Sequence, residues 1–406
     1  MIFNQITPRI VHLDINSCFA TIEQQANPIL RDKPVVVAAY TTNSGCVLAA
    51  SVTAKRLGIK TGMRVMDVKL IYPKVVVLPP DPPKYRYVHN KIKKILKSYS
   101  FDVTPKSIDE FVFHLDLPSE ACPRQVSMDI KKRIKNEVGE YITVSIGIST
   151  NRYLAKVASN LQKPDGLSEI NKDNIKNIFS KLKLTDLTGI KSGNSKRLNL
   201  YGIKTTSDFL DAPVSKLKLA FGGIGGLYWY LRLHGMEIGP PRLDEAGDFK
   251  SKRGMYGNSF APPPNKANMT LEILSKLSEK TGLRLRNANL KASGVHLFLQ
   301  DRDDNSWHMG RKLDRDIFNS NDIYKEMNNL LSISPIKDNL RHVAISTFNL
   351  KPKNSLQLEI FSNVLKKDKL TNSLDFINTK YGDYTIYPAR MINTKDIVKD
   401  RIAFGL

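Results

Sequence analysis

The sequence predicts an α+β protein with more than one domain. Its 406 residues are too many for a single hydrophobic core. In the first part of the chain, strand-like and helix-like segments alternate around one carboxylate-bearing strand, which indicates a β-α-β-β-α-β, ferredoxin-like sheet. From Leu187 the pattern changes to helices punctuated by glycine, and a second α+β region is expected to start near Lys250.

Each element follows from a local pattern. In the first region, short apolar runs bounded by turn residues predict strands over Arg9–Leu13, Pro34–Tyr40, Gly45–Ala50, Ile108–Leu115 and Thr143–Ile148. Helical spacing of apolar residues predicts helices over Phe19–Gln25, Ala54–Leu57, Tyr85–Tyr99 and Val126–Glu137.

The same signals recur in the second α+β region. They predict strands over Met255–Ala261, Gly294–Gln300, Trp307–Lys312 and Arg341–Leu350, and helices over Thr270–Asn289 and Asp322–Leu331. No sequence repeat links the two regions, and whether their sheets share a topology is left open at this point.

The charge balance favours nucleic acid as a partner. The chain has 62 Lys and Arg against 39 Asp and Glu, a formal net charge of +23, and the basic residues recur along the whole chain. A generally basic protein is the alternative.

Cys18, Cys46 and Cys122 are too widely spaced for a metal motif or a disulfide framework, which suits the cytoplasm. No apolar run is long enough for a bilayer span, and the N-terminus lacks the apolar core of a signal peptide, so no membrane partner is expected.

Three carboxylates lie at predicted strand ends. Asp14 follows the first strand, and Asp109 and Glu110 begin another. Phosphoryl transfer needs carboxylates that hold two Mg²⁺ ions roughly 3.5 to 4 Å apart. Neighbouring strand residues point to opposite faces, so Asp109 and Glu110 can serve one site only at a strand end or bulge. Taken alone, acids at strand ends are usually solvated caps, so the bare pattern favours that alternative.

The segments around these acids resemble, in order, the motifs of the Y-family (translesion, DinB/UmuC-like) DNA polymerases. VHLDINSCFATIEQQANP (11 to 28) resembles the first palm motif, and SIDEF (107 to 111) resembles the Ser-x-Asp-Glu motif. SIGISTNRYLAKVASNLQKPDGL (145 to 167) resembles the long third motif. Three such motifs in order are far more specific than any one of them.

The resemblance implies a catalytic metal centre. Asp14 and Asp109 would bridge both metal ions, Glu110 would ligate the metal at the primer 3′ end, and the backbone carbonyl of Ile15 would complete the nucleotide-side metal. Ligands that are all oxygen atoms favour Mg²⁺ over Zn²⁺, with Mn²⁺ able to replace it.

A nucleotide site is expected beside the metal centre. Ile15, Asn16, Ser17 and Cys18 join the first strand to a helix, where free backbone N–H groups could cradle a triphosphate. The resemblance assigns Lys163, in QKPDG, to the triphosphate; an exposed, solubilising lysine is the alternative.

Phe19 matches the aromatic steric gate of the family, which excludes ribonucleotides. The alternative is that Phe19 is the first apolar residue of an amphipathic helix that packs on the palm.

The finger segment from 43 to 63 departs from the DinB-type pattern. Val52 and Lys55 stand where DinB-type enzymes have tyrosine and arginine, and the segment is more similar to the UmuC-type variant. Lysine cannot make the bidentate contact of arginine, so Lys55 is either a phosphate ligand or a surface residue.

Two further segments resemble DNA-binding parts of the family. Residues 187 to 210 resemble the helix-hairpin-helix of the thumb, with a glycine turn and basic flanks that would contact DNA phosphates, or would simply join two helices. The residues concerned are Gly189, Lys191, Gly193, Lys196 and Arg197.

Residues 253 to 263 and 277 to 301 resemble the start of the little finger, with Arg253 toward DNA; a solvated sheet face is the alternative. Residues 221 to 235 are expected to pack inside the thumb around Trp229 and Tyr230.

The resemblance implies a multidomain right-hand polymerase. Its parts are a ferredoxin-like palm (1–27 and 80–180), small fingers (28–79), a helical helix-hairpin-helix thumb (181–240), a linker (241–252), an α+β little finger (253–352) and a C-terminal extension (353–406). The extension is expected to contain a further helix within residues 360 to 382.

The function implied is template-directed DNA synthesis from dNTPs on primer-template DNA. The short fingers suggest low fidelity, and no second acidic cluster for proofreading is apparent. The enzyme is expected to be a monomer; a sliding clamp is a further candidate partner, although no clamp-binding segment is recognisable at the C-terminus.

An inactive relative that only binds DNA is disfavoured because all three acids are present. Another two-metal enzyme, such as a nucleotidyl cyclase, is disfavoured by the thumb hairpin and the basic second region.

Overall fold

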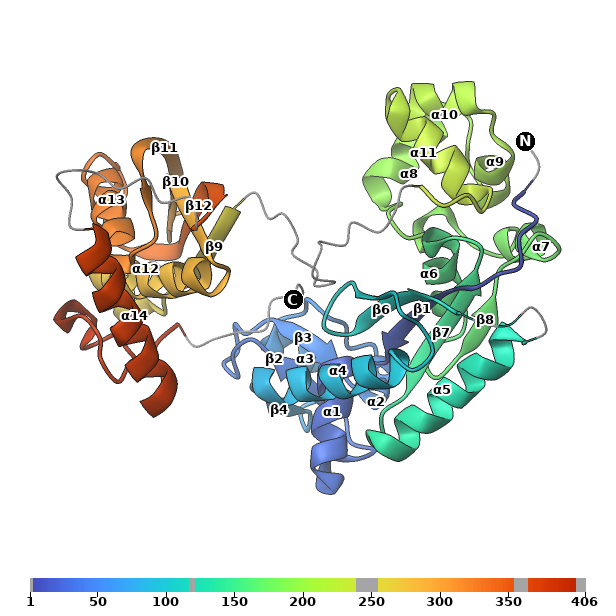
Figure 1. Ribbon diagram of the computed structural model, residues 1–406, viewed down its shortest axis with the longest axis horizontal. Helices are drawn as coiled ribbons and strands as arrows, with labels where there is room; N and C mark the ends of the chain where they lie inside the picture. Colours follow the sequence, from blue (N-terminus) through green and yellow to red (C-terminus); the bar gives the residue numbers. More distant parts are fainter. Residues whose placement is uncertain (1–2, 117, 119–120, 239–254, 354–363, 399–406) are drawn as a thin grey trace. The chain divides into compact units, whose positions relative to one another are not determined.

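The protein is described by a computed structural model, which covers residues 3–116, 118, 121–238, 255–353 and 364–398. The chain forms two compact units, with the division between Phe249 and Lys250. Each unit contains helices and a β-sheet (Figure 1). Among the described helices, none is both long and apolar enough to cross a bilayer. The linker 241–252 and Arg253 lie outside the described residues, and the finer domain boundaries stay a prediction.

The first unit is built on a five-stranded sheet in the order β5-β6-β1-β7-β8. The strands are β1 (Ile10–Ile15), β5 (Val103–Pro105), β6 (Glu110–His114), β7 (Val144–Ser149) and β8 (Leu167–Glu169). β1 pairs antiparallel with both β6 and β7, so the order β7-β1-β6-β5 is that of a ferredoxin-like sheet. β8 adds a parallel strand beside β7. The ferredoxin-like prediction is confirmed.

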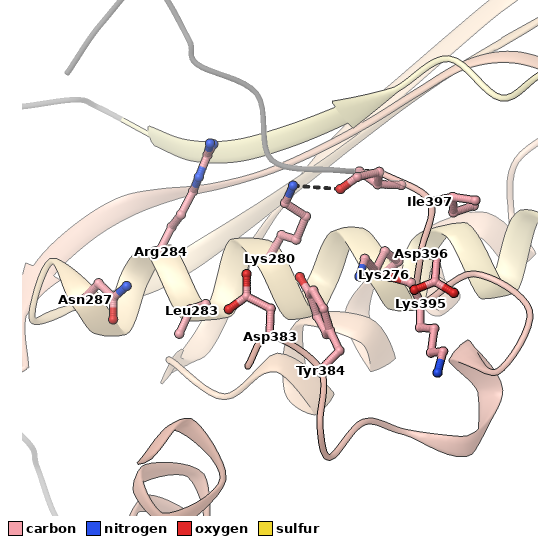
Figure 2. Close-up of a pocket in the computed structure, with 11 residues that line it drawn as sticks. Lys276, Lys280, Leu283, Arg284, Asn287, Asp383, Tyr384, Lys395, Asp396 and Ile397 are labelled. Carbon is pink, nitrogen blue, oxygen red and sulfur yellow. Dashed lines mark hydrogen bonds between the residues drawn. The ribbon is translucent and has the colours of Figure 1, made fainter. Parts of the chain in front are cut away.

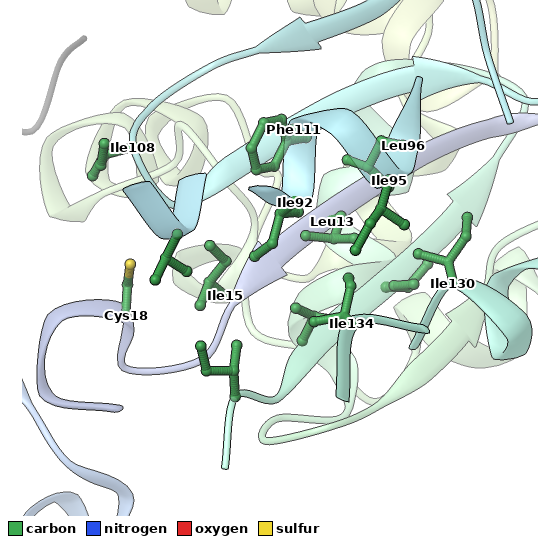
Figure 3. Packing of buried hydrophobic residues seen from close by; sticks show 14 of the residues in the cluster. Leu13, Ile15, Cys18, Ile92, Ile95, Leu96, Ile108, Phe111, Ile130 and Ile134 are labelled. Carbon is green, nitrogen blue, oxygen red and sulfur yellow. The ribbon is translucent and has the colours of Figure 1, made fainter. Parts of the chain in front are cut away.

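Helices cover both faces of this sheet. α1 (Cys18–Ala26), α4 (Pro82–Leu96) and α5 (Pro123–Glu137) share one core with the apolar residues of β1, including Leu13 and Ile15 (Figure 3). Strand alternation then directs His12 and Asp14 to the opposite face, where α6 (Arg152–Leu161) lies. α6 approaches so closely that a Cβ on Gly147 would lie 2.0 Å from the carbonyl oxygen of Ala155.

A smaller sheet in the order β3-β2-β4 forms the predicted fingers. Its strands are β2 (Val35–Ala38), β3 (Val47–Ala50) and β4 (Val76–Leu78), and its helices are α2 (Val52–Arg56) and α3 (Val65–Ile71). The sheet has its own small core, which includes Val36, Val47 and Ile59. The short strand β4 was not predicted, because it is only three residues long.

The predicted thumb is a cluster of short helices. They are α7 (Ile175–Phe179), α8 (Ser192–Leu200), α9 (Thr206–Asp211), α10 (Val214–Phe221) and α11 (Ile224–Leu233). The ring of Trp229 lies 5.6 Å from those of Phe209 and Phe221 and 5.3 Å from that of Tyr153. Tyr230 also packs against this cluster. The glycine-rich run 221 to 235 therefore serves packing, as predicted.

The second unit has the same element order as the first sheet but a different arrangement. Its elements are β9 (Met255–Phe260), α12 (Thr270–Asn287), β10 (Leu290–Asp301), β11 (Ser306–Ile317), α13 (Ser320–Ser332) and β12 (Leu340–Pro352). The strands lie in the order β11-β10-β12-β9, all antiparallel. The first strand is therefore at an edge, whereas β1 is central in the first unit. The two sheets do not share a topology.

The C-terminal segment packs on the second unit. It forms α14 (Val364–Tyr381), within the range where a further helix was predicted, and then returns along α12. Two buried lysines of α12 hold this return: Lys276 Nζ donates to the Lys395 carbonyl at 2.5 Å, and Lys280 Nζ donates to the Val398 carbonyl at 2.8 Å. Figure 2 shows these side chains beside a cleft of about 500 Å³. The segment 364–398 is thus an integral layer of this unit.

Arg286 of α12 makes the main polar contact with α14. Its guanidinium donates two hydrogen bonds to the Asp375 carboxylate, at 2.6 and 2.8 Å, and only 7% of its side chain is exposed. Removing one partner of a buried ion pair leaves the other charge uncompensated, which costs about 3 to 5 kcal/mol. The side chain of Asp375 is itself 26% exposed. The expected loss of stability therefore lies at the lower end of this range.

We expect Asp375→Ala to lower the free energy of unfolding of the second unit by about 3 kcal/mol. Urea unfolding followed by the near-ultraviolet circular dichroism of the whole chain measures this. Lys366→Ala, an exposed change on the same helix, is the matched control and should change stability by less than about 0.5 kcal/mol. Equal effects of the two substitutions would show that α14 contributes little to the unit.

Candidate active site

Strand pairing brings the predicted acids together. Asp14 on β1 and Glu110 on β6 are directly opposed in the antiparallel register. The backbone N–H of Ile15 donates to the carbonyl of Asp109 at 2.9 Å, so Asp109 lies beside β1 just before β6 begins. The strand end is therefore what allows two successive acids to approach one site, as the sequence indicated.

Each acid has a polar partner in the folded chain. Lys163 Nζ lies 2.7 Å from Asp14 Oδ2, and Ser107 Oγ donates to Asp109 Oδ1 at 2.5 Å. Lys156 Nζ, on α6, contacts both carboxylate oxygens of Glu110 at 2.8 and 2.7 Å. Three side chains therefore hold the acids in fixed directions through four short polar contacts.

The pKa values of Asp109 and Glu110 shift in opposite directions, for different physical reasons. Burial raises the pKa of Asp109 above its usual range; the hydrogen bond from Ser107 opposes this, and the charges of Asp14 and Glu110 raise it further. Burial also raises the pKa of Glu110, but His12 and Lys156 outweigh this and lower it to about 2. His12 Nε2 is 3.7 Å from Glu110 Oε2, too far for a hydrogen bond, so Lys156 makes the stronger contact.

A cleft of about 370 Å³ opens beside Asp14. It is lined by Asp14, Asn16, Ser17, Val52, Lys55, Arg56, Lys163 and Pro164. Burial lowers the pKa of Lys55, and the nearby charge of Lys163 lowers it further, whereas Asp14 and Asp109 oppose the shift. The predicted finger lysine Lys55, the predicted palm lysine Lys163 and Asp14 thus line one cleft, and the charge of Asp109 also acts on Lys55.

The turn between β1 and α1 forms part of this cleft. Ser17 adopts a left-handed backbone conformation (φ 49°), and its buried Oγ has no hydrogen-bond partner. The side chain of Asn16 is turned inward: Nδ2 donates to Ser145 Oγ at 2.9 Å, and Oδ1 accepts from the Asp165 N–H at 2.7 Å. Asn16 therefore braces the QKPDG loop, and its side-chain amide is not free for a nucleotide. Cys18 is also buried.

Comparison with known proteins places this site in a family. Models of the impB/mucB/samB family match residues 13–160, and those of its C-terminal domain match residues 255–360. DNA polymerase IV of Moorella thermoacetica is 30% identical over 389 residues, which cover 94% of this chain and 95% of that relative. The chain belongs to the Y-family of DNA polymerases. DNA polymerase IV 1 of Bacillus subtilis is 29% identical over 92% of this chain and 90% of its own length.

Solved Y-family structures show the same fold. A Y-family DNA polymerase chimera of Dbh and Dpo4 has a TM-score of 0.71 and 23% identity, over 84% of this chain and 99% of that chain. An insertion ternary complex of Dbh DNA polymerase has a TM-score of 0.57 and 24% identity, over the same shares of the two chains. The multidomain polymerase fold is therefore confirmed, with palm, fingers, thumb and little finger as its parts.

The carboxylate set of the palm fits a hard divalent cation. Among the described residues, no three His, Cys, Asp or Glu side chains gather closely enough to hold a metal ion. Two of the three acids are instead turned to lysines. The donors are nonetheless all oxygen atoms, and Asp109, whose pKa is raised mainly by burial, also lies near the charges of Asp14 and Glu110.

Phe19 is a core residue of the palm. It is 3% exposed, and its ring stacks on Tyr85 with centroids 4.5 Å apart. The Tyr85 hydroxyl in turn donates to Glu23 of α1 at 2.9 Å. Phe19 therefore packs in the palm core, as the alternative interpretation expects. Its role as a steric gate stays a prediction.

The predicted thumb contacts lie on the surface. Gly189 has φ +84°, and a Cβ there would lie 3.2 Å from the Trp229 ring, so glycine is required for the turn. Lys191, Lys196 and Arg197 are exposed on or just before α8, and no neighbour lies within 4 Å of a Cβ placed on Gly193. The positions suit phosphate contacts, which stay a prediction together with Arg253.

Four site residues were missed from the sequence: His12, Ser107, Lys156 and Arg56. His12 is two residues before Asp14, so strand alternation alone places both on one face. Ser107 lies inside the second family motif, where the sequence pattern alone gives it no contact with Asp109. Lys156 lies within the quoted third motif, but only the packing of α6 over β1 shows that it reaches Glu110. Arg56 follows Lys55 and gave no separate signal.

Proposed function

We propose that the Asp14 cleft is where this DNA polymerase transfers nucleotides from dNTPs to the 3′-OH of a DNA primer. The observation that carries the proposal is the position of Asp14, Asp109 and Glu110 at the ends of paired strands, with Asp14 on the wall of the cleft that Lys55 and Lys163 also line. Phosphoryl transfer depends mainly on such positioning and charge stabilisation.

The acids would hold two Mg²⁺ ions, for which Mn²⁺ could substitute. Asp14 and Asp109 would contact both ions, Glu110 the ion at the primer end, and the Ile15 carbonyl the ion on the nucleotide side. Bound divalent ions would activate the attacking hydroxyl and neutralise charge on the leaving pyrophosphate. The Ser107 hydrogen bond fixes the Asp109 carboxylate, and Asn16 fixes the loop that carries Lys163.

The cleft cations would bind the triphosphate. Lys163 is paired with Asp14 at 2.7 Å and would exchange that carboxylate for a phosphate oxygen when a nucleotide enters. Lys55 and Arg56 line the finger side of the same cleft. Arg56 can offer the bidentate contact that lysine at position 55 cannot, which offsets the departure from the DinB-type pattern. The orphan hydroxyl of Ser17 offers a further hydrogen bond.

DNA would be held largely through its backbone. The net charge of +23 and the exposed cations of α8 support this. The enzyme is proposed to act as a cytoplasmic monomer with low fidelity and without proofreading. Its three cysteines are all unpaired, in keeping with a reducing compartment. A sliding clamp stays a candidate partner.

Primer extension tests the proposal. The purified chain is incubated with an end-labelled primer-template, all four dNTPs and Mg²⁺, and products are separated by length. Extension that depends on the template and on the metal is expected. Binding without extension would favour an inactive relative, and cyclic nucleotide formation without a primer would favour a cyclase; either result would contradict the proposal.

Removing the second unit should weaken DNA binding more at low salt than at high salt. A fragment that ends near Gly247 keeps the catalytic acids but loses the phosphate contacts of the little finger. Its plot of log binding constant against log salt should therefore be shallower, by about 0.9 for each lost contact. Fluorescence anisotropy at several salt concentrations measures both slopes. Identical slopes for the fragment and the whole chain would show that the little finger does not touch DNA phosphates.

A further inference from the structure

Lys156 occupies the carboxylate that the proposed primer-side metal would need. Its ammonium group lies 2.8 Å from Glu110 Oε1 and 2.7 Å from Oε2, so one cation engages both oxygens. Glu110 begins β6 and is fixed there by its pairing with Asp14. Strand pairing fixes the backbone of Glu110, and the contacts with Lys156 set the direction of its carboxylate.

The surroundings of Glu110 offer a second nitrogen group, the His12 imidazole, and in the described part of the chain the only acid that pairs with Lys156 is Glu110. His12 Nε2 lies 3.7 Å from Glu110 Oε2, and its Nδ1 contacts Ser159 Oγ at 3.1 Å. The His12 side chain is 2% exposed, whereas 33% of the Lys156 side chain is exposed to solvent. Lys156 is thus the partner that can leave, because water can solvate its ammonium group.

Lys163 likewise forms an ion pair with a carboxylate of the site, that of Asp14. Each lysine comes from the third family motif, and each contacts an acid at 2.7 Å. Lys163 has a triphosphate to move to when a nucleotide binds. Lys156 has no place in the proposed mechanism, so its contact with Glu110 needs a separate explanation.

We propose that Lys156 is an exchangeable counter-ion of Glu110 that competes with the divalent metal for this carboxylate. The inference rests on the proposed function, because it takes Glu110 to be a metal ligand. A metal ion that approaches Glu110 must displace the ammonium group or share the carboxylate with it, and the two cations repel each other. Lys156 thereby lowers the metal affinity of the free enzyme and keeps Glu110 oriented until the metal arrives.

The test is Mn²⁺ binding to the metal-free, DNA-free whole chain, followed by the electron paramagnetic resonance signal of free Mn²⁺. Lys156→Met keeps the length of the side chain and removes the charge, and we expect it to bind Mn²⁺ roughly threefold to tenfold more tightly. Lys156→Arg keeps the charge and should remain within about twofold of the wild type. Lys181→Met, an exposed change of the same charge, should have no effect beyond that range.

A double-mutant cycle with Glu110→Gln identifies the carboxylate concerned. In the Glu110→Gln background, Lys156→Met should bring no gain in affinity, because the contested group is gone. Unchanged or weaker Mn²⁺ binding by Lys156→Met would overturn the proposal, and so would an equal gain in the Glu110→Gln background. Lys156→Gln and a melting curve guard against a folding defect of the methionine variant. Failure of primer extension by the wild type would instead contradict the proposed function, so the two failures are distinguishable.

Discussion

Asp14→Ala, Asp109→Ala and Glu110→Ala should each reduce primer extension by at least about a thousandfold, with primer-template binding largely retained. The expected loss corresponds to roughly 4 kcal/mol of transition-state stabilisation, in the range that a metal ion supplies to phosphoryl transfer. DNA affinity should persist because it depends on Lys and Arg contacts to phosphates, which these substitutions leave in place. Single-turnover extension with saturating dNTP and Mg²⁺ measures the rate, and anisotropy measures binding.

The controls must separate loss of metal from loss of fold. Each acid has a cationic or hydroxyl partner, so its removal leaves Lys163, Ser107 or Lys156 without that contact. Melting curves of the three variants show whether the palm stays folded. Asp67→Ala removes an exposed carboxylate that pairs with Arg64 in the fingers and should leave the rate within about twofold. Near-wild-type turnover by any of the three palm variants would remove that acid from the metal centre.

The palm could be predicted from the sequence because its signals are local. β1 alternates apolar and polar residues, and Asp14 and the Asp109-Glu110 pair lie where two such strands end. The antiparallel pairing of β1 with β6 and β7 agrees with the ferredoxin-like sheet predicted from this pattern. Strands of three residues, such as β4, β5 and β8, are too short to show a period of two, and none of them was predicted.

Long-range packing accounts for what the sequence could not show. The side chain of Asn16 turns inward because Ser145 and the Asp165 backbone, about 130 to 150 residues away in the chain, meet it there. Lys156 reaches Glu110 only because α6 crosses β1. The second sheet repeats the element order of the first and yet places its first strand at an edge, so element order alone did not decide strand order. In the same way, long-range contacts such as those of Arg286, Lys276 and Lys280 reveal that residues 364–398 belong to the second unit.

Phe19→Ala should raise the use of ribonucleotides relative to deoxynucleotides by roughly tenfold to hundredfold, the range that a steric pocket contributes to discrimination. Asp14, five residues earlier, would hold the metal-bound phosphates, so the first turn of α1 would lie beneath the sugar of the same nucleotide. A flat ring there leaves room for the C2′ hydrogen but not for a hydroxyl group, and rejection occurs by clash. Single-nucleotide insertion of rNTP and dNTP by wild type and variant measures the ratio of kcat/KM values.

The burial of Phe19 determines how this experiment must be controlled. With 3% of the residue exposed and its ring stacked on Tyr85, its removal leaves a cavity that costs about 3 to 5 kcal/mol whichever role it has. A loss of stability is therefore expected whether Phe19 is a steric gate or only a core residue. The ratio of rNTP to dNTP insertion is the measurement that separates the two roles. Ile22→Ala empties the same core one turn further along α1, where no sugar would lie, and should destabilise the palm without changing the rNTP to dNTP ratio. Phe19→Leu refills most of the volume with a narrower side chain, and we expect it to restore stability more than discrimination. If Phe19→Ala and Ile22→Ala shift the rNTP to dNTP ratio equally, Phe19 only packs in the palm core and does not select between ribonucleotides and deoxynucleotides.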